Sequence, residues 1–82
     1  MNTDATTAVR GALAGIAPEA DLDTLPGDAD LQEELDLDSM DFLNFLIALG
    51  DATGIRVPES DYARVHTFDG CVGYVRAHLG GA

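Results

Sequence analysis

One serine of this chain lies where its hydroxyl group could do chemistry. Asp38 precedes Ser39 and Asp41 follows two residues later, where a polar connection gives way to a strongly apolar segment. A phosphate carried at a helix N-terminus is stabilised by the free N–H groups and the helix dipole. We therefore interpret Ser39 as a serine that is modified, and not as a catalytic one. Because serine and aspartate are common helix caps, these residues alone also fit an ordinary helix start.

The remaining residues that could support catalysis or metal binding form no recognisable site. His66 and His78 fall in different segments, and neither forms a nucleophile-and-base pattern with Ser39 or Cys71. We interpret the histidines as surface or capping residues and Cys71 as a small core residue. The acids of residues 21–39 do not match the calcium-loop pattern, which requires a glycine and a closing glutamate at set positions. We expect no catalytic residue and no metal site.

Composition limits the class of protein. The 82 residues predict one domain spanning residues 1–82, and 15 acids against four arginines give a net charge of −11. Such a surface repels nucleic acid and anionic membranes but attracts proteins with basic patches. The single cysteine excludes an internal disulfide bond. With neither a signal-peptide pattern nor a long apolar run, we expect a cytoplasmic monomer.

The first half of the chain predicts one helix and a long connection. Residues 4–17 read as a helix that Asp4 caps and Pro18 ends. Residues 18–38 form an acidic connection that is unusually long for a compact domain. Its regularly placed leucines suggest that it is held across the core. These are Leu22, Leu25, Leu31, Leu35 and Leu37.

The second half predicts three more helices. Residues 39–52 form a helix with seven large apolar residues, more than one buried stripe needs. We expect this helix to be central to the core and also partly exposed to a partner. An extended segment at residues 55–57, a short helix at 59–65 and a last helix capped by Thr67 follow. The predicted fold is all-α, a small antiparallel four-helix bundle of three main helices and one short helix, with a long first loop.

Four segments resemble acyl carrier proteins. Asp38-Ser39-Met40 is similar to the motif that opens the second helix of that family. Residues 55–59 resemble the family's extended segment with a proline, and residues 65–68 resemble the entry to its fourth helix. The Asp30-Leu31 pair resembles the end of the family's long first loop. The similarity in order and spacing covers nearly the whole chain.

The resemblance implies a carrier and not an enzyme. A phosphopantetheinyl transferase would attach 4′-phosphopantetheine from coenzyme A to Ser39, and the terminal thiol would carry acyl groups as thioesters. Expected partners are that transferase and the acyl-loading ligases or synthases, which would present basic patches to the acidic carrier. The helix that begins at Ser39 would be the recognition helix.

The resemblance also implies roles for two further groups of residues. Those expected to contact partners are Asp38, Met40, Asp41, Phe42 and Phe45. Those expected to line a pocket for the acyl chain are Leu43, Ile47, Leu49, Val57 and Tyr62, for which plain core packing is the alternative.

The middle of the recognition helix departs from the family pattern. Fatty-acid carriers of central metabolism have several glutamates there, whereas this chain has Phe42, Asn44 and Phe45. We expect Phe42 to be an exposed apolar contact, and we favour a specialised lipid or polyketide-type pathway over central fatty acid biosynthesis. An aminoacyl or peptidyl carrier is the nearest alternative, although residues 35–37 lack its glycine-rich approach to the serine. An unmodified interaction module and an acidic cation-binding protein or small enzyme are the remaining alternatives.

Overall fold

The computed structural model describes residues 4–80, and all of its regular structure is helical. The α-helices are α1 (Ala5–Ile16), α2 (Leu31–Glu34), α3 (Ser39–Thr53) and α4 (Phe68–Gly80). The 3-10 helices are η1 (Leu22–Thr24) and η2 (Glu59–Val65). Within the described range the only pairing of sheet type is an isolated bridge between Asp30 and Thr67. The all-α fold class is therefore confirmed.

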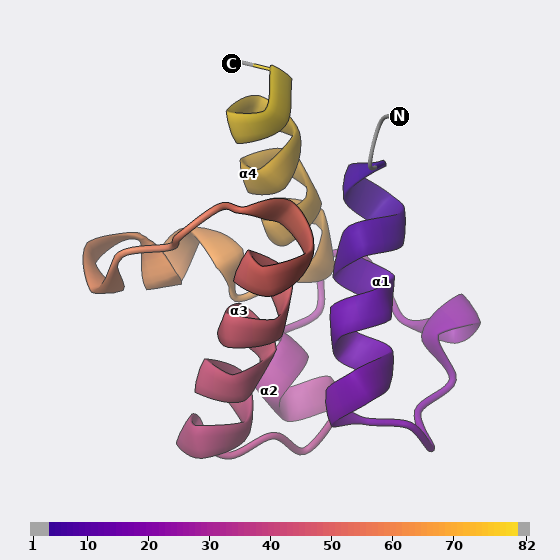
Figure 1. Ribbon diagram of the computed structural model, residues 1–82. Coiled ribbons are helices and arrows are strands. Elements are labelled where there is room, and N and C mark those ends of the chain that lie inside the picture. Colours follow the sequence, from indigo (N-terminus) through magenta and orange to yellow (C-terminus); the bar gives the residue numbers. More distant parts are fainter. Residues whose placement is uncertain (1–3, 81–82) are drawn as a thin grey trace.

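The three long helices enclose the core. α1 packs against both α3 and α4, and η2 packs against α4. α1 begins at the top of the view in Figure 1 and α3 begins at the bottom, so their N-termini lie at opposite ends of the fold. The molecule is compact, with principal extents of 33 × 26 × 21 Å. No helix in residues 4–80 has the length and apolar character that crossing a membrane requires.

The helix predicted for residues 4–17 is confirmed. The Asp4 carboxylate accepts a hydrogen bond from the Thr7 N–H at 3.1 Å, which caps the N-terminus of α1. The helix ends just before Pro18, which disfavours helical geometry in the residue that precedes it. Its core-facing side consists of small and branched side chains: Ala5, Ala8, Val9, Ala12 and Leu13 are buried. Small residues on this side let α3 and α4 approach closely.

The long connection is held against the core, as its leucines predicted. Leu31 and Leu37 are buried, and the other three leucines pack partly buried against the core cluster. Two backbone hydrogen bonds add to this: the Leu31 N–H donates to the His66 carbonyl at 2.8 Å, and the Asp69 N–H donates to the Gly27 carbonyl at 2.9 Å. The short helices η1 and α2 within the connection were not predicted.

The segment predicted as a short helix over residues 59–65 is η2, a 3-10 helix. It is tied to α4 because the Tyr74 hydroxyl donates to the Asp61 carboxylate at 2.8 Å. The Thr67 hydroxyl accepts from the Gly70 N–H at 3.0 Å, which confirms the predicted cap of α4. The buried residues of η2 and α4 are Val65, Cys71, Val72, Tyr74 and Val75.

Candidate functional site

Ser39 is the first residue of α3, and it is exposed. Asp38 and Asp41 form a reciprocal capping box around it. The Asp38 carboxylate accepts from the Asp41 N–H at 2.8 Å, and the Asp41 carboxylate accepts from the Asp38 N–H at 3.4 Å. The box fixes the first helical turn without using the N–H groups of Ser39 and Met40, which have no partner within the helix. An exposed hydroxyl therefore lies on a rigid helix N-terminus.

The chain reaches Ser39 through a sharp turn. Asp36 has a φ of 53°, in the left-handed region that few residues other than glycine adopt. The next residue, Leu37, is buried, and its N–H donates to the Gln32 carbonyl at 2.9 Å. This turn and the leucine anchor hold the start of α3 at the surface.

A groove begins at Ser39 and runs between α3 and η2. Its volume is about 420 Å³. The residues that line this Ser39 groove are Gln32, Ser39, Phe42, Leu43, Glu59, Tyr62, Ala63 and His66. The groove offers a linear group attached to Ser39 a path along the protein surface.

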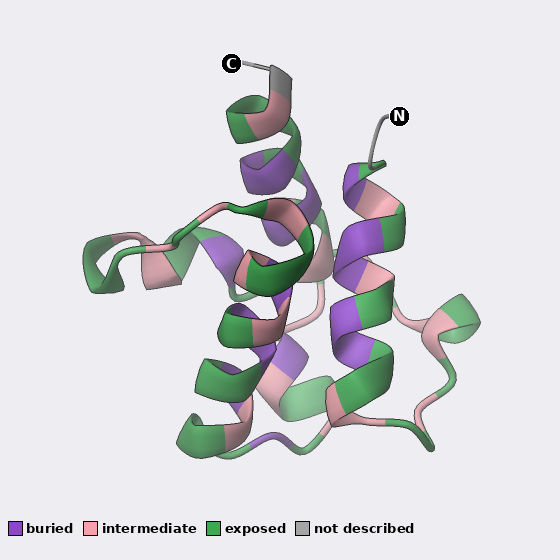
Figure 2. Cartoon of the chain, in the orientation of Figure 1, coloured by how far each residue is buried: buried purple, intermediate pink, exposed green. Residues whose placement is uncertain are grey.

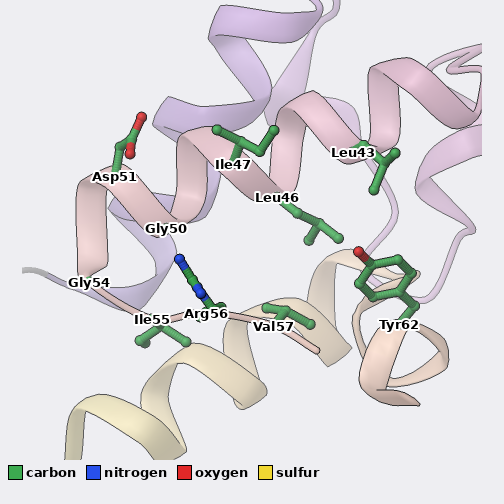
Figure 3. Close-up of a pocket in the computed structure, with 10 residues that line it drawn as sticks. All are labelled: Leu43, Leu46, Ile47, Gly50, Asp51, Gly54, Ile55, Arg56, Val57 and Tyr62. Carbon is green, nitrogen blue, oxygen red and sulfur yellow. The ribbon is translucent and has the colours of Figure 1, made fainter. Parts of the chain in front are cut away.

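A second cavity, the inner pocket, lies farther along α3 (Figure 3). Its volume is about 340 Å³. It is lined by Leu43, Leu46, Ile47, Gly50, Asp51, Gly54, Ile55, Arg56, Val57 and Tyr62. Leu43 and Tyr62 line both cavities, so the Ser39 groove and the inner pocket meet at these two side chains.

The structure corrects the expectation for Phe42 and Phe45. Phe42 is 7% exposed and Phe45 is 0% exposed, so neither is an exposed contact for a partner, and Phe42 contributes only to the wall of the Ser39 groove. The two rings pack 6.0 Å apart, and Phe42 meets Tyr62 edge to face at 6.1 Å. The prediction of an exposed Phe42 contact is wrong because this side of α3 turns toward the core.

Leu49 requires a similar correction. It is fully buried in the core and does not line the inner pocket, so the core-packing alternative is the right one for this residue. The other four residues predicted for the pocket, Leu43, Ile47, Val57 and Tyr62, all line it. Sequence reasoning did not identify Leu46 or Arg56 as pocket residues. The helical spacing of Leu46 from Leu43 is a signal that was available.

Of the other residues capable of chemistry, His66 lines the Ser39 groove, whereas Cys71 and His78 line neither the groove nor the inner pocket. Residues 4–80 contain no group of three or more side chains that could hold a metal ion. Cys71 is buried, and burial raises the pKa of its thiol to about 12, so it is a poor nucleophile. His66 and His78 are exposed, and their Nδ1 atoms donate to the carbonyls of Ala63 and Tyr74. These are the surface and capping roles that the sequence predicts.

The sequence matches the phosphopantetheine attachment site family over residues 7–75. It is 29% identical over 62 residues to an acyl carrier protein of Lactobacillus acidophilus, covering 76% of this chain and 78% of the relative. It is 33% identical over 58 residues to an acyl carrier protein of Lactobacillus johnsonii, covering 71% and 72%. The chain therefore belongs to the acyl carrier protein family, whose cofactor is covalently attached 4′-phosphopantetheine.

The start of α3 fits such a group. A phosphodiester on the Ser39 oxygen would lie at the positive end of a 15-residue helix, beside two N–H groups that the capping box does not use. The capping hydrogen bonds also hold the Asp38 and Asp41 carboxylates against the backbone. The Ser39 groove would accommodate the arm. When attached, the group supplies a thiol that forms thioesters.

Proposed function

We propose that Ser39 is the attachment residue and that the protein carries acyl groups between the enzymes of a specialised lipid or polyketide-type pathway. In the attachment reaction the Ser39 oxygen attacks the phosphorus of coenzyme A that bears the pantetheine. The bond to the second phosphate breaks, adenosine 3′,5′-bisphosphate leaves, and the hydroxyl proton passes to the transferase. The observation that carries this proposal is the exposed Ser39 hydroxyl at a capped helix N-terminus, beside a groove.

The chain also contains a second serine, which makes the assignment testable. Ser60 is exposed, flanked by Glu59 and Asp61, and lies near the start of η2. Its helix has seven residues and no side-chain cap, and Ser60 does not line the Ser39 groove. Acidic neighbours and exposure are thus common to both serines, and only Ser39 has the long capped helix and the groove.

The partner surface proposed for α3 combines charge with apolar contact. Asp38 and Asp41 would meet basic residues of the transferase and of the acyl-loading enzymes. Met40 and Ile47 are 64% and 62% exposed, so they would be apolar contacts on the same helix. The middle of α3 offers these apolar side chains in place of an acidic stripe, which supports a dedicated pathway.

Intact mass spectrometry with coenzyme A and a promiscuous phosphopantetheinyl transferase tests the attachment. We expect one phosphopantetheine increment on the wild type and on Ser60→Ala, and none on Ser39→Ala. Circular dichroism of Ser39→Ala would establish that the variant is folded. An increment on Ser39→Ala, or none on unmodified, folded wild type with several active transferases, would overturn the proposal and favour an unmodified interaction module.

A further inference from the structure

The four arginines of this acidic chain have different surroundings. Arg10 forms the one ion pair found within residues 4–80, with Asp23. Arg64 lies over the Tyr74 ring, 5.4 Å from its centroid, and Arg76 is exposed on α4. Arg56 lines the inner pocket. One of few positive charges is therefore located in the cavity that an acyl chain would enter.

The turn at the end of α3 determines the position of Arg56. Gly54 ends the helix with a φ of 76°, and its N–H donates to the Gly50 carbonyl at 2.7 Å. The chain then runs back beside α3, where a Cβ atom at Gly50 would lie only 3.1 Å from the Ile55 carbonyl oxygen. Ile55 and Val57 pack against the core, and the Arg56 side chain between them points toward α3 near Gly50 (Figure 3). The backbone therefore places Arg56 at the edge of the pocket, where its exposed side chain contributes to the lining.

The rest of the inner pocket leaves the charge of Arg56 available to a ligand. Its walls are mainly the aliphatic side chains of Leu43, Leu46, Ile47 and Val57. Asp51 also lines the pocket, but it forms no ion pair with Arg56, and its carboxylate points away from it in Figure 3. Arg56 is an exposed residue, so water solvates its charge when the pocket is empty. A wholly aliphatic acyl tail would offer the guanidinium group no hydrogen-bond acceptor, whereas a carboxylate would offer one with the opposite charge.

The positions of the two cavities indicate which residues an acyl group carried on Ser39 would contact first and which last. The Ser39 groove contains Ser39 but not Arg56, and the inner pocket contains Arg56 but not Ser39. The path between them passes Leu43 and Tyr62, so Arg56 would meet the far end of the acyl group. A pocket of about 340 Å³ is near the lower end of the range of about 300–1,000 Å³ for ligand sites, which favours a short acyl group.

We propose that Arg56 is a specificity-determining residue, and that the cargo is a short acyl group ending in a carboxylate, the half-thioester of a dicarboxylic acid. This inference rests on the proposed function, because the acyl group must be attached through Ser39. The carboxylate pairs with the Arg56 guanidinium, and the methylene spacer contacts the aliphatic walls of the inner pocket.

The test compares two cargoes that differ only at their far end. The transferase loads hexanoyl- or adipoyl-phosphopantetheine from the corresponding coenzyme A thioester, and intact mass confirms each product. In the wild type we expect the adipoyl form to melt about 2–5 °C above the hexanoyl form. In Arg56→Gln we expect the order to reverse, because the added carboxylate then only increases the repulsion within an acidic protein.

Two further measurements separate this effect from a general change in charge or folding. Arg76→Gln removes the same charge outside the pocket, so it should keep the wild-type order. In the unmutated protein, the Arg56 Nε–H resonance should shift between the hexanoyl and adipoyl forms, and that of Arg76 should not. This NMR comparison holds even if Arg56→Gln does not fold.

The outcomes distinguish this inference from the proposed function. Failure of loading would overturn the proposed function and the cargo inference with it. Normal loading would overturn the cargo inference alone if the adipoyl form showed no advantage, if Arg56→Gln kept that advantage, or if the Arg56 resonance did not shift.

Discussion

The two sides of α3 have nearly the same composition but different surroundings. Phe42, Phe45, Leu46 and Leu49 are buried against the core, whereas Met40, Leu43 and Ile47 on the other side are exposed (Figure 2). An amphipathic helix normally has a polar outer face. The exposed apolar residues of α3 therefore need an explanation other than core packing. One side therefore contributes stability, and the proposed function assigns the other to partner recognition.

The largest expected effect is on the core side. We expect Phe45→Ala to lower the free energy of unfolding by about 3–5 kcal/mol, because the deletion leaves a cavity in a close-packed core. Small domains have about 5–15 kcal/mol in total, so this variant would be marginally folded. Urea denaturation followed by circular dichroism measures the loss. A loss below about 1 kcal/mol would contradict the assignment of this side to the core.

The second prediction tests whether the core excludes water at Cys71, which belongs to the same buried cluster as Phe45. Burial raises the pKa of its thiol from 9.0 to about 12, so the folded state holds a proton that the unfolded state loses above pH 9. Stability should therefore be unaffected by this group below pH 9 and fall between pH 9 and 12, by up to about 1.4 kcal/mol per pH unit. Urea titrations at several pH values measure the fall.

Cys71→Ala is the control for this pH dependence and should show a shallower fall. Tyr74 also contributes to the alkaline pH dependence, because burial and the hydrogen bond to Asp61 raise the pKa of its hydroxyl above its usual value. Tyr74→Phe separates its contribution. An unchanged slope in Cys71→Ala would show that the thiol is not held in the core.

The third prediction compares the two ends of α3. Asp38→Ala removes a cap hydrogen bond, and we expect it to lower the free energy of unfolding by about 0.5–2 kcal/mol. Asp51→Ala removes an exposed acid in the last part of the same helix, where the dipole disfavours negative charge, so stability should stay equal or rise by a few tenths of a kcal/mol. The same urea experiment measures both, and equal effects would argue against the capping box.

The smallest effect on stability is expected on the exposed side. Ile47→Ala should change the free energy of unfolding by less than about 0.5 kcal/mol, because the side chain is mostly in water and alanine favours helix. In contrast, kcat/KM of a partner enzyme that acts on the loaded carrier should fall. A loss of stability comparable to that of Phe45→Ala would mean that the two sides of α3 do not differ as described.

Local sequence signals predicted the elements well. The helices capped by Asp4, Asp38 and Thr67 all begin where the sequence predicts, because capping depends on one side chain and the adjacent backbone. The leucines of the long connection predicted that it packs on the core, since an exposed loop has no need of them. The 3-10 geometry of η2 and the short helices η1 and α2 have no comparably strong sequence signal.

The register of α3 could not be predicted in the same way. The polar stripe of Asp41, Asn44 and Asp51 is narrow, and it does not decide which of the seven large apolar residues face the core. The sequence therefore predicts a partner surface at Phe42 and Phe45 and a pocket position for Leu49, and the structure corrects both. Packing against α1 decides which side is buried, and that is a tertiary effect. The location of Arg56 depends in turn on how the chain folds back after Gly54.

The exposure of Met40 has a consequence for oxidative chemistry. An exposed thioether is open to oxidants, which convert it to a polar, chiral sulfoxide that reductases can restore. Because the Met40 side chain is 64% exposed, its oxidation would leave the packing of the fold almost unchanged. It would, however, alter the surface directly beside Ser39. Oxidation of Met40 would therefore change the interaction with partner enzymes, while thermal unfolding would still show an intact fold.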